Sequence, residues 1–219
     1  MLKTASCLPV ILALMCSSCS ESRQAVTEQS STTQAQAVAK KMNIKIILGS
    51  TRKGRTSDKI AAALKNISDK REDITTEILD LNDYNLPFFN DEVPPAMRQV
   101  ITDPITKKWA NKISEGDAFI IVVPEYNAGY PGVLKNALDS LYKEWNNKPV
   151  AFVGFSGGPS GGANAIAQLQ QVALALKMKP VANDIKVPTA WKAFDEKRNL
   201  TNPTIASELN TMIEQLKNS

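Results

Sequence analysis

The segment 118–123 reads Ala-Phe-Ile-Ile-Val-Val and is apolar throughout. So short and uniform a run is typical of a central strand in a parallel sheet, which is buried on both faces. Four further strands are predicted by apolar or alternating segments at 44–48, 75–81, 149–155 and 180–187. Apolar residues at helical spacing lie between and after them, at 57–67, 133–141, 165–176 and 205–216. This alternation predicts one α/β domain over 42–219, with a five-stranded parallel sheet and helices on both of its faces.

The composition removes several kinds of catalytic site. The chain has no histidine, and its three cysteines, Cys7, Cys16 and Cys19, lie within the first nineteen residues. Imidazole acid–base chemistry, Ser-His-Asp and Cys-His nucleophiles and histidine metal sites are therefore excluded, as are thiolate sites and disulfides from residue 20 onward. An enzyme made from the remaining residues works through carboxylates, lysine, tyrosine and hydroxyls, or takes its chemistry from a cofactor.

The net charge of +4 does not indicate a nucleic-acid partner. Residues 1–41 carry four basic and two acidic residues, and the remaining 22 basic and 20 acidic residues again leave a balance of +2. Nucleic-acid binding is associated with clustered basic residues on one face, which this nearly balanced domain does not indicate. We therefore expect no nucleic-acid partner.

The first nineteen residues have the order of an export signal. A lysine at position 3 is followed by an apolar run over 7–16 and by the small residues Ser17 and Ser18. The run is shorter than the roughly 20 residues that a membrane-spanning helix needs. Cys19 resembles the lipid-modified cysteine of bacterial lipoproteins, although Cys16 stands where leucine is usual. The pattern predicts a signal peptide over 1–19 that ends in a lipidated Cys19.

Residues 20–41 are rich in Ser, Thr, Gln and Ala and lack apolar periodicity, which is typical of a flexible linker. Together with Cys19 they predict a domain tethered to a membrane on the exported, periplasmic side. The alternative is that the protein starts at Met42, just before the first strand, and is cytoplasmic.

Three polar or glycine-rich loops follow predicted central strands, at the edge of the sheet where open α/β proteins bind ligands. The first loop, 49–57, reads Gly-Ser-Thr-Arg-Lys-Gly-Arg-Thr-Ser and leads into a helix. Hydroxyls and backbone N–H groups at a helix start favour an anion, and Arg52 or Arg55 would add charge-assisted bonds. The loop is neither a Walker A motif nor a Gly-x-Gly-x-x-Gly motif, so a phosphate monoester fits it best. The alternative is an ordinary helix start with surface arginines.

The second loop, 124–132, reads Pro-Glu-Tyr-Asn-Ala-Gly-Tyr-Pro-Gly, and its asparagine amide beside tyrosine faces suits a flat heteroaromatic ring. The third loop, 156–164, has four glycines within six positions, which lets its backbone approach a ligand closely. Taken singly, the two loops also fit surface packing and a flexible connection. Three such loops on successive strand ends indicate one ligand site.

These motifs together resemble the NADPH-dependent FMN reductase family. The resemblance rests on Gly49-Ser50-Thr51-Arg52…Ser57, on Pro124-Glu125-Tyr126-Asn127 with its Leu134-Lys135-Asn136…Asp139 continuation, and on the 157–162 glycine loop. It covers about residues 43–180. It implies a flavodoxin-like three-layer sandwich with a five-stranded parallel sheet. The family includes chromate, quinone and azo-dye reductases. Most relatives begin near the equivalent of Met42, so the N-terminal extension is a departure that bears on location.

The resemblance also implies roles for individual residues. Ser50, Arg52 and Ser57 would hold the FMN phosphate. Pro124, Glu125, Tyr126 and Asn127 would lie along the isoalloxazine ring and ribityl chain, and Ser156, Gly157 and Gly158 would approach the ring. No side chain is needed as a nucleophile or tuned base, because hydride transfer is the chemistry of the flavin.

The function expected from these observations is hydride transfer from NADPH or NADH through FMN to a small acceptor such as a quinone, azo compound, metal oxyanion or free flavin. The alternatives are a flavodoxin-like electron carrier without reductase activity and a lipoprotein that has lost cofactor binding. We also expect a homodimer or homotetramer, because 85–89 (Asn-Leu-Pro-Phe-Phe) and Trp145 place aromatic groups near predicted connections. Packing of these groups within one subunit is the alternative.

Overall fold

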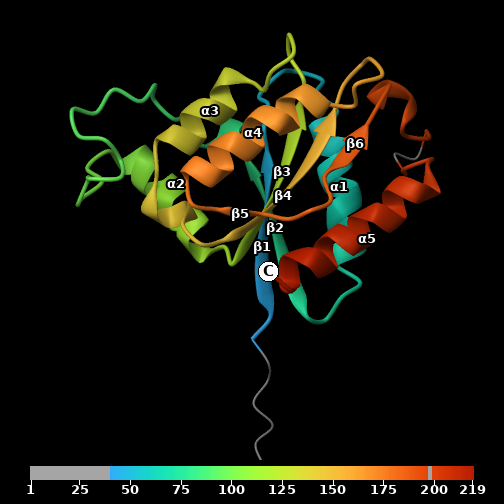
Figure 1. The fold of residues 1–219 in the computed structure, drawn as a ribbon, viewed down its shortest axis with the longest axis horizontal. Helices are drawn as coiled ribbons and strands as arrows, with labels where there is room; N and C mark the ends of the chain where they lie inside the picture. Colours follow the sequence, from blue (N-terminus) through green and yellow to red (C-terminus); the bar gives the residue numbers. More distant parts are fainter. Residues whose placement is uncertain (1–39, 197–198) are drawn as a thin grey trace, which may run out of the picture. The chain divides into compact units, whose positions relative to one another are not determined.

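The apolar segment forms the central strand of a parallel sheet. The computed structural model describes residues 40–196 and 199–219, and in it β3 (Ala118–Pro124) is buried along its whole length. Its neighbours are β1 (Met42–Leu48) and β4 (Pro149–Phe155), and β2 (Ile74–Asp80) pairs with β1 at one edge. The order β2-β1-β3-β4-β5, parallel throughout, confirms the predicted flavodoxin-like sheet (Figure 1).

The fifth position of the sheet is shared by two short strands. The predicted strand over 180–187 is interrupted, and β5 (Lys179–Pro180) and β6 (Ile185–Val187) both pair with β4. Val181 still donates to the Val150 carbonyl at 2.9 Å, after which the chain leaves the edge through the polar residues Asn183 and Asp184. A proline at an edge has no N–H to give to the ladder, which favours so short a strand.

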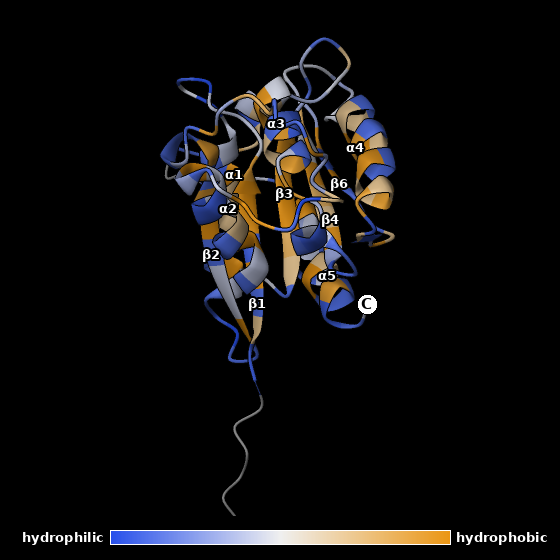
Figure 2. Cartoon of the chain, turned by 90° about the vertical axis from the view of Figure 1, so that its left-hand side faces the viewer, coloured by the Kyte–Doolittle hydropathy of each residue, from blue (hydrophilic) through white to orange (hydrophobic). Residues whose placement is uncertain are grey.

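Helices cover both faces of the sheet in three layers. One face carries α1 (Ser57–Ser68) and α5 (Pro203–Lys217), and the other carries α2 (Pro104–Glu115), α3 (Gly132–Asp139) and α4 (Ala163–Ala175). Figure 2 shows the hydrophobic strands enclosed between helices whose outer surfaces are hydrophilic. Among the described residues, no helix combines the length and apolar character needed to cross a membrane.

Helix α2 was absent from the elements predicted above. It begins at an Asp-Pro pair, where the Asp103 carboxylate accepts from the Thr106 N–H at 2.6 Å and Pro104 takes the first helical position. Trp109 and Ile113 are fully buried, one turn apart, against the sheet. The cap and the spacing are both visible in the sequence, so the signal was present.

Trp145 belongs to the core. Its side chain is fully buried, its Nε1 donates to the Leu138 carbonyl at 3.2 Å, and its ring meets Trp109 and Phe119 edge to face. The expectation that Trp145 contributes to a subunit interface is therefore wrong. An indole that is buried with a satisfied N–H stabilises the monomer's own fold.

The strand register brings the ligand-edge loops together. Leu48 of β1 lies beside Val122 of β3, and Val122 lies beside Val153 of β4, so the three strands end at one edge. At that edge α4 starts directly against β4. A Cβ on Gly162, whose φ is +90°, would lie 2.5 Å from the Phe155 nitrogen, so only glycine permits this contact.

The first strand and the last helix meet at the opposite edge. The Met42 N–H donates to the Asp73 carbonyl at 3.1 Å, and the Asp73 carboxylate pairs with Lys217 near the end of α5. The Arg71 guanidinium forms ion pairs with the Asp73 carboxylate at 2.8 Å and with the Glu214 carboxylate of α5 at 2.5 Å. The start of β1 and the end of α5 are thus neighbours, away from the ligand-edge loops.

Candidate functional site

A cavity of about 350 Å³ lies at the carboxyl ends of the strands. It is lined by all three predicted loops and by the segment that follows β6. The lining residues are Arg52, Thr56, Pro124, Glu125, Tyr126, Phe155, Ser156, Gly157, Ala190 and Trp191. The structure therefore brings together at one cavity the loops that the sequence analysis grouped.

Ser50 connects the first loop to the second. Its side chain is 1% exposed, its Oγ lies 2.8 Å from the Tyr126 hydroxyl, and it also accepts from the Arg52 N–H at 3.2 Å. Ser50 is not among the cavity-lining residues. Its hydroxyl fixes the position of Tyr126, which forms part of the wall.

The two arginines of the first loop have different surroundings. The Arg55 guanidinium contacts both Asp80 oxygens, one of them at 2.9 Å, and donates to Asp58 at 2.8 Å and to the Ser50 carbonyl at 2.5 Å. It is thus occupied in joining the loop to the end of β2, and the expectation that it serves an anion is not supported. Arg52 lines the cavity, and no ion pair of its side chain occurs within 40–196 and 199–219.

The start of α1 has the features of an anion site. Thr56, the N-cap residue, lines the cavity and makes no capping bond with its side chain. The next residue, Ser57, is fully buried and is not among the cavity-lining residues, and its Oγ has no hydrogen-bond partner in the described structure. A buried hydroxyl without a partner costs about 1–3 kcal/mol, which a ligand oxygen would recover. This orphaned hydroxyl, the helix start and Arg52 fit the phosphate of FMN.

The second loop folds into a tight hairpin. Tyr126 and Gly129 exchange backbone hydrogen bonds of 2.8 and 3.0 Å around Asn127 and Ala128, whose φ angles are 51° and 60°. Positive φ at both central positions is the geometry of a type I′ turn, for which asparagine is well suited and alanine is not. Asn127 is exposed at the tip and does not line the cavity, whereas Pro124, Glu125 and Tyr126 do.

Glu125 caps the helix that follows the third loop. Its carboxylate accepts from Asn164 Nδ2 at 2.9 Å and from the Asn164 backbone N–H at 3.1 Å, in the first turn of α4. The Asn164 side-chain bond lowers the pKa of Glu125, so the carboxylate stays ionised at neutral pH. Glu125 therefore positions the second loop against α4 and is no general acid.

The third loop is held from within and by the segment after β6. Ser156 Oγ donates to the Gly158 carbonyl at 2.9 Å and accepts from the Gly161 N–H at 3.0 Å. The Thr189 and Ala190 N–H groups donate to the carbonyls of Gly158 and Ser156, at 3.0 and 2.9 Å. Ser156 and Gly157 line the cavity, whereas Gly158 does not line it and accepts the hydrogen bond from Thr189.

Four lining residues were not identified from the sequence: Thr56, Phe155, Ala190 and Trp191. Thr56 and Phe155 adjoin predicted loops and follow from them. Ala190 and Trp191 come from Pro188-Thr189-Ala190-Trp191, which leaves the carboxyl end of β6. The predicted strand over 180–187 has the same carboxyl end, Val187, but ligand loops were expected only after the central strands, so this fourth loop was not predicted.

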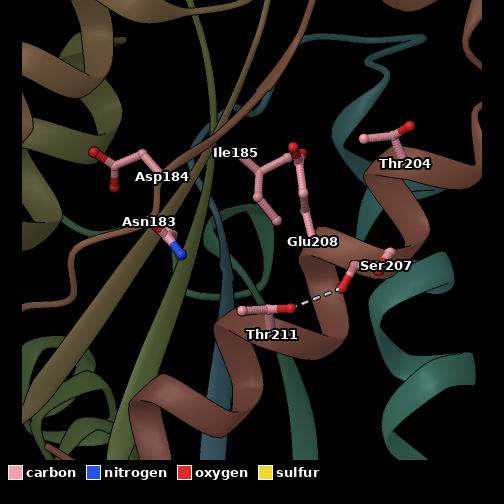
Figure 3. A pocket seen from close by; sticks show the side chains of 7 residues that line it. All are labelled: Asn183, Asp184, Ile185, Thr204, Ser207, Glu208 and Thr211. Carbon is pink, nitrogen blue, oxygen red and sulfur yellow. Dashed lines mark hydrogen bonds between the residues drawn. The ribbon is translucent and has the colours of Figure 1, made fainter.

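A second cavity, of about 290 Å³, lies between α5 and the connection that leads into β6. Figure 3 shows Ser207, Glu208 and Thr211 along α5, with the Asp184 carboxylate turned away from them. That carboxylate accepts from Gln170 Nε2 at 2.5 Å, and burial raises its pKa. Among the described residues, the acidic Asp184 and Glu208 and no basic residue line this cavity, which does not suit an anionic cofactor.

Comparison with known proteins identifies the family. A model of the NADPH-dependent FMN reductase family matches residues 42–192. The chain belongs to this family. It is accordingly an FMN-dependent NAD(P)H oxidoreductase, and the cavity at the strand ends is the site that fits its cofactor.

The relatives include an NAD(P)H-dependent FMN reductase of Schizosaccharomyces pombe, 40% identical over 62% of this chain and 68% of that protein. A 2-hydroxy-1,4-benzoquinone reductase of a Burkholderia species is 29% identical over 76% of this chain and 87% of that protein. Among solved structures, the flavoenzyme FerB, an NAD(P)H:(acceptor) oxidoreductase of Paracoccus denitrificans, superposes with a TM-score of 0.68 at 24% identity. That match covers 81% of this chain and 98% of FerB, and it confirms the flavodoxin-like fold.

The Arg55–Asp80 contact predicts a pH-dependent stability of the first loop. Burial raises the Asp80 pKa, but the hydrogen bonds from Arg55 and Asn82 and the charge of Arg55 together outweigh it and leave the pKa below its usual value. Asp80→Asn should lower the free energy of unfolding by about 1.5–3 kcal/mol at pH 7. The stabilisation that comes from a lowered carboxyl pKa is lost as the pH falls from about 3.9 through the lower pKa of the folded protein. The free energies of unfolding of wild type and Asp80→Asn should therefore become more similar in acid.

Urea unfolding of both proteins at pH 7 and at pH 3 measures this difference. Asp83→Asn is the matched control, because Asp83 is an exposed aspartate of the same segment and should leave stability nearly unchanged. A constant difference between wild type and Asp80→Asn at both pH values would contradict the assignment.

Proposed function

We propose that this oxidoreductase reduces small organic acceptors, with quinones as the main class and azo compounds, metal oxyanions and free flavin as others. The observation that carries the proposal is the cavity, which combines a helix start and Arg52, a cation without an ion pair among the described residues, with the aromatic walls Tyr126 and Trp191. Quinone reductase is also the name of relatives in Pseudomonas putida and, for a hydroxybenzoquinone, in Burkholderia. A redox cofactor supplies the chemistry that a domain without histidine or cysteine lacks.

We assign the FMN phosphate to the start of α1. Arg52 would contribute a charge-assisted bond from its guanidinium and Ser57 its hydroxyl, both of which lack a side-chain partner in the part of the chain that the structure describes. Ser50 would act through Tyr126, which it holds in place. One phosphate site of this kind, without a dinucleotide motif, favours FMN over FAD.

The ring of the cofactor is assigned to the second and third loops. Pro124, Glu125 and Tyr126 would line one part of its site, and Ser156 and Gly157 another. Asn127 and Gly158, which do not line the cavity, would act through the hairpin and through the carbonyl that accepts from Thr189. These backbone-rich walls leave room for a flat ring and offer N–H groups to its edge.

In the mechanism that we propose, FMN when bound supplies the hydride chemistry. The chain orients the nicotinamide and then the acceptor, which use the same cavity in turn and so give ping-pong kinetics. The ionised Glu125, engaged with Asn164, takes no proton from the substrate. Electron transfer to a protein partner, as in flavodoxin, is the alternative function.

We further propose a homodimer or homotetramer built on the segment between β2 and α2. This segment exposes Phe88, Met97 and Val100, which are 86%, 72% and 70% exposed, and apolar groups gathered on one stretch mark interaction surfaces. A second copy of this chain is the partner that fits, because the segment forms part of the reductase domain itself.

The location that we propose is a membrane tether through Cys19, with 20–41 as the linker; Cys19 and residues 20–39 lie outside the described residues. A flexible chain of 22 residues spans about 25 Å. The position of Met42 is compatible with such a tether, because β1 begins at the edge opposite the cavity, so a linker attached there leaves the cavity unobstructed. Cytoplasmic protein starting at Met42, with its direct access to NADPH, is the alternative.

Steady-state assays test the reductase proposal. The purified protein should release FMN on heating and oxidise NADPH or NADH with 2-methyl-1,4-naphthoquinone as acceptor. Parallel lines in double-reciprocal plots would support the ping-pong order. Bound FMN without NAD(P)H oxidation would favour the electron carrier, and protein without flavin would contradict both.

Replacing Arg52 by Ala should weaken FMN binding about tenfold or more, because a hydrogen bond to a charged group contributes about 1.5–3 kcal/mol. Titration of apoprotein with FMN, followed by quenching of flavin fluorescence, gives the Kd. Lys53→Ala is the matched control, since Lys53 is exposed in the same loop and does not line the cavity. Equal Kd values for wild type and Arg52→Ala would place Arg52 outside the site.

Light scattering at micromolar concentration should give the mass of a dimer or tetramer. Phe88→Glu should shift it toward the monomer, because it places a charge at the most exposed aromatic of the segment. Leu174→Glu, at an exposed leucine of α4, serves as the control. A wild-type mass of one subunit would refute the oligomer.

Cys19→Ala should move the protein from the membrane fraction to the soluble fraction, because the acylated residue is removed. Cell fractionation followed by mass spectrometry of the N-terminal peptide measures this. A soluble wild-type protein whose first peptide begins at Met42 would contradict the tether and leave the reductase proposal intact.

A further inference from the structure

Trp191 is an exposed indole at the cofactor cavity. The chain has three tryptophans, of which Trp109 and Trp145 are fully buried and Trp191 is 67% exposed. Exposing so large an apolar surface costs free energy, which a ligand that covers the ring would recover. Trp191 lines the cavity together with Arg52 and Tyr126, so a molecule in that cavity is within its reach.

The backbone before Trp191 is strained and firmly held. Thr189 has a φ of 48°, a left-handed conformation that is unfavourable for a β-branched residue. Its N–H and that of Ala190 donate to the carbonyls of Gly158 and Ser156, at 3.0 and 2.9 Å. These bonds fix the short 3₁₀ turn Ala190–Lys192 to the third loop. Strain that is maintained by surrounding contacts is concentrated at functional sites.

Trp191 lies on a segment of its own at the cavity, the one that leaves the carboxyl end of β6. The groups assigned to the cofactor lie in the first three loops. Trp191 is on the fourth segment and is largely exposed, as suits contact with a molecule that enters and leaves.

One face of the indole is already in contact with a cation. Lys192 Nζ lies 4.6 Å from the centre of the Trp191 ring, within the range of a cation–π contact. Since Trp191 is 67% exposed and lines the cavity, ring surface remains for a second ring, and aromatic rings stack with a geometry that favours flat partners.

We propose that Trp191 determines acceptor specificity, by stacking on the planar ring of the acceptor and favouring flat aromatic acceptors over ring-less ones. This inference rests on the proposed reductase function. The residue acts on binding of the acceptor, and the proposal assigns it no part in holding FMN.

Kinetics with two acceptors test the proposal on FMN-loaded protein. In Trp191→Ala, the KM for 2-methyl-1,4-naphthoquinone should rise about tenfold, while the KM for ferricyanide, which has no aromatic ring, stays within about twofold of wild type. Trp191→Phe should keep a KM for 2-methyl-1,4-naphthoquinone close to that of wild type, because phenylalanine retains a flat ring. Leu174→Ala is the control for loss of an exposed apolar side chain away from the cavity.

A binding measurement gives a readout that does not depend on turnover. Titration with 1-naphthol, a two-ring compound that is not reduced, should perturb the flavin absorbance of the wild type. The Kd for naphthol should be about tenfold weaker in Trp191→Ala and nearly unchanged in Trp191→Phe. The Kd for FMN itself should be unchanged in both variants.

Three results would overturn the inference. They are a Trp191→Ala protein indistinguishable from wild type, an equal loss with both acceptors, and a weakened affinity for FMN, which would make Trp191 a cofactor residue. A wild-type protein that binds naphthol through Trp191 but oxidises no NAD(P)H with either acceptor would instead refute the proposed function alone. Failure of the Trp191 proposal and failure of the proposed reductase function therefore give different results.

Discussion

Burial of β3 on both faces is the constraint from which the rest of the architecture follows. A strand made only of apolar side chains is stable only if helices cover both sides of the sheet, so each connection between parallel strands must cross over a face. Such crossovers return every strand in the same direction, and all the strands then end at one edge. The cavity is the consequence at that edge, where α1 and α4 begin and their N–H groups face the ends of the strands.

The site is shaped by bonds between loops, and its charged residues are mostly structural. Ser50 reaches Tyr126, Glu125 reaches Asn164, and Gly158 accepts from Thr189, so each loop is tied to another loop or to a helix start. Arg55 belongs to the same framework through Asp80. Of the arginines in the first loop, only Arg52 presents a guanidinium to the cavity without an ion pair in the described residues. Because the cofactor carries the chemistry, the chain has to bind and orient it, and the loops do so.

The sequence was sufficient for the sheet, for most of the helices and for the three loops, because each depends on local pattern and on one topological rule. It was insufficient where the outcome depends on contacts between distant segments. The role of Arg55 follows from Asp80, 25 positions away, and the role of Glu125 follows from Asn164, 39 positions away. Trp191 was not predicted because it follows the edge strand that ends at Val187, whereas ligand loops were expected only after central strands. Helix α2 is predictable from the sequence, since Asp103 and Pro104 mark its start.

The meeting of Met42, Asp73 and Lys217 has a practical consequence for work with this domain. Because the first strand starts and the last helix ends at the edge away from the cavity, a reporter protein or affinity handle fused at either junction would not obstruct the approach to the cavity. Attachment of the domain to an electrode through the same edge would turn the cavity toward the solution. Circular permutation that joins the two ends would need only a short connection, since Asp73 already contacts both.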